Sequence, residues 1–84
     1  MKKVEVFTRD QCAFCDQAKN LLKQQDIDFI EYNIWHDQAA ANDMKMRVPN
    51  ARTVPQIFIN GEAIGGYAEL AKLHQNGTLK SLVS

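Results

Sequence analysis

The amino-acid sequence predicts an α/β fold, with a mixed four-stranded sheet and helices on both of its faces. Segments with strand-like alternation of apolar residues are separated by segments of helical spacing, in the order βαβαββα. A helix that joins two strands makes a crossover, so the first two strands are expected to be parallel. An Asn-Gly pair at residues 60–61 predicts a tight hairpin, and therefore an antiparallel pair as well.

The first part of the chain predicts a helix between two strands. Residues 3–7 and 27–34 alternate polar and apolar side chains and contain β-branched residues, which is typical of strands. Between them, apolar side chains recur at helical spacing over residues 13–25. Asp10 belongs to a residue type that often caps helices, so it is the expected N-cap, with Gln11 as another possible start.

A second helix and a third strand are expected next. Asp37 is a good N-cap, and the helix should end near Val48 because Pro49 disfavours helical geometry in the residue before it. A loop over residues 49–53 then leads into a strand over residues 54–59.

The last part of the chain completes the sheet and adds a helix. Residues 62–64 are expected to form the antiparallel partner in the hairpin, and Gly65-Gly66 should end that strand. Helical spacing returns over residues 67–75, and a last helical turn over residues 78–83 should pack back on the sheet.

The size and net charge of the chain argue against some classes of function. A chain of 84 residues predicts a single domain, residues 1–84. Ten basic and ten acidic residues give no net charge, which argues against nucleic acid or an anionic membrane as the partner. No apolar run approaches the roughly 20 residues that span a bilayer. The N-terminus lacks the apolar segment of a signal peptide, so a cytoplasmic location is expected.

The only two cysteines, Cys12 and Cys15, stand at the start of the first expected helix. A Cys-x-x-Cys pair can be a redox dithiol, half of a zinc site or part of an iron–sulfur site. In a reducing compartment it is more often catalytic or metal-binding than structural. Unpaired N–H groups at a helix start favour an anion, so Cys12 is expected to be the exposed nucleophile and Cys15 the buried resolving thiol.

Five motifs occur together over nearly the whole chain: Phe7-Thr8-Arg9, Cys12-Ala13-Phe14-Cys15, Thr53-Val54-Pro55-Gln56-Ile57-Phe58-Ile59, Asn60-Gly61 and Ile64-Gly65-Gly66-Tyr67. In these motifs the chain resembles the glutaredoxins, small dithiol members of the thioredoxin-like fold. The resemblance implies a thiol–disulfide oxidoreductase that reduces protein disulfides and glutathione mixed disulfides. Glutathione would re-reduce it, with no tightly bound cofactor. Its partners would be glutathione and disulfide-containing proteins, ribonucleotide reductase among them, and it would act as a monomer.

The resemblance also implies a binding groove beside the cysteines. A cis Val54-Pro55 bond would face the cysteine pair and leave the backbone of Val54 free for an extended peptide. The helix start after Gly65-Gly66 would hold the γ-glutamyl carboxylate of glutathione. Arg9 or Arg52 would pair with the glycyl carboxylate. The expected binding residues, with no metal ligand among them, are Arg9, Phe14, Arg52, Thr53, Val54, Pro55, Gly66, Tyr67 and Ala68.

Some residues depart from the family pattern. Ala13 replaces the usual Pro, and Phe14 the usual Tyr. Ala68 and Asn42 each remove a possible glutathione contact, so weak glutathione binding is expected. Two alternatives therefore stay open. One is an electron donor re-reduced by thioredoxin reductase. The other, which Ala13 favours, is a binding module that holds a [2Fe–2S] cluster between two subunits.

Five further residues lie outside the motifs. His36 and His74 are expected at the surface. Trp35, Met44 and Met46 are expected in the core or on a helix face.

Overall fold

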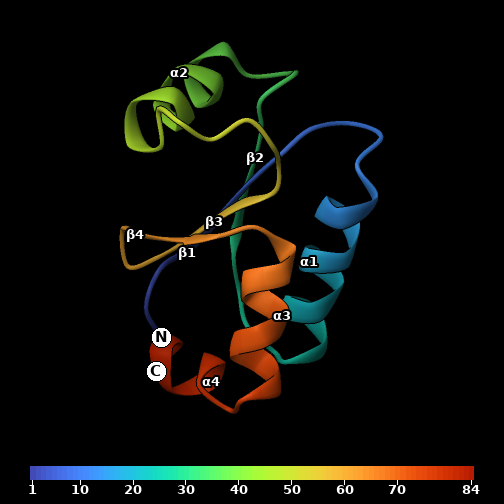
Figure 1. Cartoon of the computed structure of the whole chain (residues 1–84), viewed down its shortest axis with the longest axis vertical. Coiled ribbons are helices and arrows are strands. Elements are labelled where there is room, and N and C mark those ends of the chain that lie inside the picture. Colours follow the sequence, from blue (N-terminus) through green and yellow to red (C-terminus); the bar gives the residue numbers. More distant parts are fainter.

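The computed structural model describes all 84 residues and has the predicted order of elements. These are β1 (Val4–Thr8), α1 (Ala13–Gln24), β2 (Ile30–Asn33), α2 (Gln38–Arg47), β3 (Gln56–Ile59), β4 (Glu62–Gly65), α3 (Tyr67–Gln75) and α4 (Leu79–Val83). The strands form one sheet in the order β2-β1-β3-β4 (Figure 1). β1 runs parallel to β2 and antiparallel to β3, so the predicted mixed sheet is confirmed.

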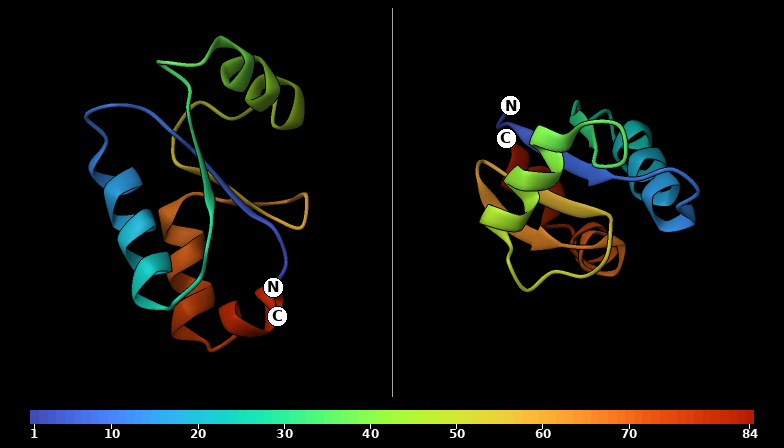
Figure 2. Two further views of the ribbon diagram at one scale, coloured as in Figure 1. Left: turned by 180° about the vertical axis from the view of Figure 1, so that it is seen from behind. Right: turned by 90° about the horizontal axis from the view of Figure 1, so that it is seen from above.

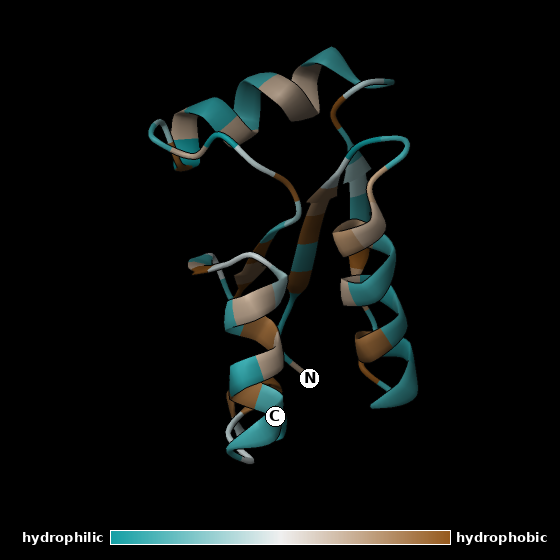
Figure 3. Cartoon of the chain, turned by 45° about the vertical axis from the view of Figure 1, so that its right-hand side comes forward, coloured by the Kyte–Doolittle hydropathy of each residue, from teal (hydrophilic) through white to brown (hydrophobic).

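One face of the sheet carries the larger core. Val4 and Val6 of β1 point to this face, as do Ile57 and Ile59 of β3. The helices α1, α3 and α4 cover it with Ala18, Leu22, Leu70, Leu79 and Val83. Figure 2 shows α1 and α3 lying side by side. In Figure 3 both helices carry hydrophobic and hydrophilic residues in turn, as expected of helices that bury one side.

The opposite face is covered by α2. Ala40 and Met44 of α2 pack against Phe7 of β1 and Phe58 of β3. Helices therefore lie on both faces, as predicted. The position of α2 matters for function, because this helix also forms one side of the groove described below.

An ion pair between buried Glu5 and half-buried Arg47 joins α2 to the centre of the sheet. The carboxylate of Glu5, whose side chain is 3% exposed, accepts hydrogen bonds from both terminal nitrogens of Arg47, at 2.9 and 3.1 Å. The Tyr32 hydroxyl also donates to it, at 3.2 Å. The Arg47 guanidinium lies over the rings of Phe7 and Phe58. Hydrogen bonding to Arg47 holds the pKa of Glu5 below its usual range, and the same contact raises the pKa of Arg47.

Several local predictions are confirmed. The Asp37 carboxylate accepts a hydrogen bond from the N–H of Ala40 and caps α2. Asn60 and Gly61 both have positive φ, 53° and 85°, as a tight turn between β3 and β4 requires. The last helical turn is α4, and the backbone N–H of Lys2 donates to the carbonyl of Val83, which brings the two ends of the chain together (Figure 1).

Other predictions need correction. β2 begins at Ile30 instead of residue 27, because Ile27 is buried in the core after α1 and its N–H bonds to the carbonyl of Leu22. Trp35 lies in the turn between β2 and α2 and is 57% exposed, so it belongs neither to the core nor to a helix. Met44, which is buried, and Met46, which is exposed, both lie on α2, as expected of residues in the core or on a helix face.

Candidate active site

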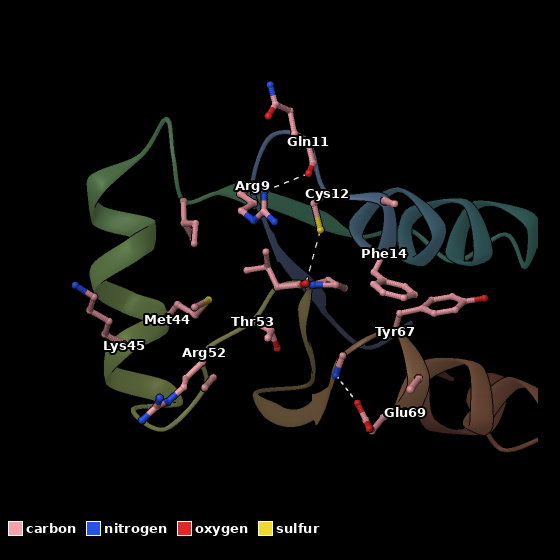
Figure 4. A pocket seen from close by; sticks show the side chains of 17 residues that line it. Arg9, Gln11, Cys12, Phe14, Met44, Lys45, Arg52, Thr53, Tyr67 and Glu69 are labelled. Carbon is pink, nitrogen blue, oxygen red and sulfur yellow. Dashed lines mark hydrogen bonds between the residues drawn. The ribbon is translucent and has the colours of Figure 1, made fainter.

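A groove of about 680 Å³ opens beside the cysteine pair. It lies between the start of α1, the start of α3, one side of α2 and the loop that precedes β3 (Figure 4). All nine residues expected to bind substrate or glutathione line this groove, together with Cys12. The topology therefore brings together segments that lie more than forty residues apart in the sequence.

Cys12 is the N-cap of α1, and its sulfur accepts a hydrogen bond from the backbone N–H of Cys15 at 3.1 Å. Asp10 is therefore not the cap, contrary to the sequence prediction. The two cysteines are joined by a disulfide, with Cα atoms 5.2 Å apart. After reduction, the N–H of Cys15 and the helix dipole are placed to stabilise a thiolate on Cys12.

The two cysteines differ in access to solvent. Cys15 lies in the first turn of α1 and is 1% exposed, as a resolving thiol should be. Cys12 is 8% exposed, so the expectation of an exposed nucleophile is wrong in degree. It lines the groove, which means that a disulfide must enter the groove to reach it.

The loop before β3 provides the floor of the groove. The Val54-Pro55 peptide bond is cis, as expected. The carbonyl oxygen of Val54 lies 3.6 Å from the sulfur of Cys12 (Figure 4). Thr53 is exposed, and its carbonyl accepts a hydrogen bond from the Gln56 side chain at 2.8 Å. These contacts place the backbone of the loop before β3 directly beside the reactive sulfur.

The start of α3 forms a second side of the groove. Leu70 makes the first hydrogen bond within this helix, to the carbonyl of Gly66, so the N–H groups of residues 67–69 have no helical partner. The N–H of Gly66 donates to the carboxylate of Glu69 at 2.7 Å. The helix start can therefore accept an anion at Tyr67 and Ala68, but its Gly66 N–H is already taken.

Two aromatic side chains form the rim next to α3. The rings of Phe14 and Tyr67 stack with their centroids 6.0 Å apart (Figure 4). Phe14 is 59% exposed even with this contact. The pair is an apolar surface at the mouth of the groove, where Phe14 was expected to bind substrate or glutathione.

Three cations line the groove, and none has a carboxylate within ion-pair distance: Arg9, Lys45 and Arg52. Arg9 donates to the carbonyls of Asp10 and Gln11, so it also holds the loop before Cys12. Arg52 is exposed and extends along the α2 side (Figure 4). Only one carboxylate lines the groove, that of Glu69. The groove therefore carries excess positive charge although the chain as a whole is neutral.

Some groove residues were missed from the sequence: Gln11, Ala13, Ile34, Met44, Lys45, Ala51 and Glu69. Met44 and Lys45 come from α2, and only the packing of this helix on the sheet brings them to the groove. Glu69 could have been found, because a Glu three residues after a helix cap is a common capping signal. Asn42 bonds to Gln38 on α2 and does not line the groove.

The structure has neither a cluster of metal-binding side chains nor a helix that could cross a membrane. No group of three or more His, Cys, Asp and Glu side chains is arranged to hold a metal ion. None of the helices has the length and apolar character that crossing a membrane requires.

Comparison with known proteins gives a consistent result. A family model described as Glutaredoxin matches residues 4–64. A probable glutaredoxin from Synechocystis sp. is 44% identical, with the match covering 98% of this chain and 75% of that protein. The solution structure of a dithiolic glutaredoxin from Trypanosoma brucei brucei is 32% identical with a TM-score of 0.87, over 99% of this chain and 88% of that one. A buckwheat glutaredoxin–glutathione complex is 25% identical with a TM-score of 0.86, over 98% of this chain and 76% of that one.

Proposed function

This chain belongs to the glutaredoxin family and is a dithiol thiol–disulfide oxidoreductase, and on that premise we propose that glutathione binds in the groove and re-reduces Cys12 and Cys15. The observation that carries the proposal is the position of Cys12. Its sulfur caps α1, accepts the N–H of Cys15, and lies beside the backbone of Val54 in a groove with unpaired cations.

The reaction proceeds by two thiol exchanges. The Cys12 thiolate attacks one sulfur of a substrate disulfide, forms a mixed disulfide with it, and expels the other sulfur as a thiolate that takes up a proton. Cys15 loses its proton and attacks the sulfur of Cys12. This forms the Cys12–Cys15 disulfide and releases the second substrate thiol. The two electrons that reduce the substrate come from the two protein thiols.

Two glutathione molecules return those electrons. The first attacks the Cys12–Cys15 disulfide, forms a mixed disulfide with Cys12, and leaves Cys15 as a thiol. The second attacks the glutathione sulfur of that mixed disulfide, which releases Cys12 as a thiolate and yields glutathione disulfide. The N–H of Cys15 donates to the leaving sulfur of Cys12 in this step.

The charges of the groove support glutathione as the ligand. Glutathione has a carboxylate at each end, and the groove offers a cationic side and a helix start. The N–H groups of Tyr67 and Ala68 would receive the γ-glutamyl carboxylate, and Arg9 or Arg52 the glycyl carboxylate. The backbone of Val54 would pair with the central cysteinyl residue. A similar protein, the buckwheat glutaredoxin, has been solved as a glutathione complex.

Protein disulfides are the proposed larger substrates. An extended segment would pair with Val54 and place its disulfide against Cys12. The disulfide form of ribonucleotide reductase is one candidate, with this domain acting as a cytoplasmic monomer. Reduction of that protein in a purified system tests the candidate, and lack of reduction at saturating glutathione would exclude it.

The central test measures reduction of a small glutathione mixed disulfide, with glutathione, glutathione reductase and NADPH. Wild type should turn over, Cys12→Ser should be inactive, and Cys15→Ser should keep part of the activity because glutathione can resolve the mixed disulfide on Cys12 alone. The same assay with thioredoxin reductase in place of the glutathione system is the comparison. Turnover only with thioredoxin reductase would disprove glutathione as the reductant.

A further inference from the structure

The loop that carries Cys12 is fastened to the turn between β2 and α2. The Asp10 carboxylate accepts a hydrogen bond from the Asn33 side chain at 2.9 Å, and His36 Nε2 lies 2.7 Å from its other oxygen. The Arg9 guanidinium lies over the ring of Trp35, 5.2 Å from its centroid. These contacts join residues that are 23 to 26 positions apart in the chain. They hold Arg9 and Asp10, the loop residues that come shortly before Cys12, against this turn.

Asp10 is a carboxylate two residues before the nucleophile, and its charge opposes a thiolate there. The hydrogen bond from Asn33, followed by the hydrogen bond and the charge of His36, holds the pKa of Asp10 below its usual range, so it is ionised at neutral pH. Arg9 forms no ion pair with the Asp10 carboxylate and donates to backbone carbonyls instead, and the Asp37 carboxylate caps α2 through Ala40.

We propose that His36 is a positioning residue for the dithiol chemistry and that it acts through Asp10. The contact holds the loop in place before α1, where Gln11 has a positive φ of 54° and Cys12 begins the helix cap. The contact also keeps the Asp10 carboxylate directed toward the turn between β2 and α2. Loss of His36 should therefore disfavour the Cys12 thiolate in two ways of the same sign. The inference needs only the chemistry of Cys12 and does not depend on glutathione as the reductant.

A thiolate titration tests this proposal. In the reduced Cys15→Ser protein Cys12 is the only thiol, and its ionisation can be followed by thiolate absorbance or by the pH dependence of alkylation. Adding His36→Asn should raise the midpoint by about 0.3 to 1 pH unit, the size expected of one partly exposed charge. His74→Asn is the matched control, because His74 is the other exposed histidine and lies on α3 outside the groove. It should leave the midpoint unchanged.

A double-mutant cycle separates this role from a purely structural one. Asp10→Asn should lower the midpoint, because it removes the charge while its amide oxygen can still accept from Asn33. In that background His36→Asn should have little effect. Neither side chain is buried, at 67% exposed for His36 and 45% for Asp10, so the variants are expected to fold. An unchanged midpoint in His36→Asn, or a shift that persists fully in Asp10→Asn, would overturn the proposal.

Discussion

Single side chains at the rim decide what the groove presents to a ligand. Phe14 contributes apolar surface through its stack on Tyr67, and a Tyr at this position would add a hydroxyl at the mouth. Glu69 has the opposite effect, because its carboxylate occupies the Gly66 N–H and adds negative charge where an anion should bind. Glu69 therefore adds a further physical reason for the weak glutathione binding that Ala68 and Asn42 predict.

Gly65 leaves space for the Glu69 side chain to bond to the N–H of Gly66. Its φ is +115°, which side chains rarely adopt, and a Cβ there would lie 2.8 Å from Oε1 and 2.9 Å from Cγ of Glu69. Gly65→Ala should therefore reduce the free energy of unfolding by about 1 to 3 kcal/mol, measured by urea denaturation. Gly61→Ala is the control, because Gly61 also has a positive φ but nothing lies within 4 Å of its Cβ position. Equal losses of unfolding free energy in the two variants would show that the close approach of the new Cβ to Glu69 does not reduce stability.

At the scale of elements, the Glu5–Arg47 pair holds α2 to the sheet together with the apolar contacts of Ala40 and Met44. Glu5 is buried in β1, and the pair links it to the last residue of α2. Glu5→Gln keeps the shape of the side chain but removes the charge that Arg47 faces. The free energy of unfolding at neutral pH should fall by about 1 to 3 kcal/mol, as expected when a charged buried partner is lost.

The pH dependence of this stability has a definite sign. The folded pKa of Glu5 lies below its ordinary value of about 4.5. Its contribution is therefore present above that value and is lost as the pH falls through it toward the lower folded pKa. Unfolding curves should show that the difference between wild type and Glu5→Gln shrinks over this acid range. Asp43→Asn, which removes an exposed partner of the same Arg47, should change stability by only about 0.5 kcal/mol. A difference in stability between wild type and Glu5→Gln that stays constant at all pH values would contradict the lowered folded pKa of Glu5.

At the scale of the whole molecule, the sequence was sufficient for the order of the elements and for the nine predicted residues that line the groove with Cys12. It was less so for the groove residues from α2 and for the contacts between elements. Alternation and helical spacing report which side of an element is buried, and this is a local property. The Glu5–Arg47 pair joins residues 42 positions apart, and no local pattern reports such a contact. For the same reason the sequence identified His36 as a surface residue but not its contact with Asp10. Gln11 turns the backbone before Cys12, so the sulfur and not the Asp10 carboxylate caps α1.

A substitution in α4, near the end of the chain, tests whether stability and activity can be separated in so small a domain. Leu79 of α4 is 1% exposed and belongs to the larger core, yet it does not line the groove. Leu79→Ala should reduce the free energy of unfolding by about 2 to 4 kcal/mol, a large share of the total for a chain of this size. Below its melting temperature, the same variant should keep the turnover of wild type with the small mixed disulfide.

Leu82→Ala supplies the matched comparison, because Leu82 is on the same helix and only partly buried. Its loss of stability should be smaller, since less apolar surface returns to solvent when its side chain is removed. The groove is built by α1, α2, α3 and the loop before β3, and no residue of α4 lines it. Figure 1 shows α4 at the end of α3 that lies away from the start of that helix. Loss of activity in a Leu79→Ala variant that is still folded would mean that the core transmits changes in α4 to the start of α3. Stability and activity could then not be treated as independent properties of this domain.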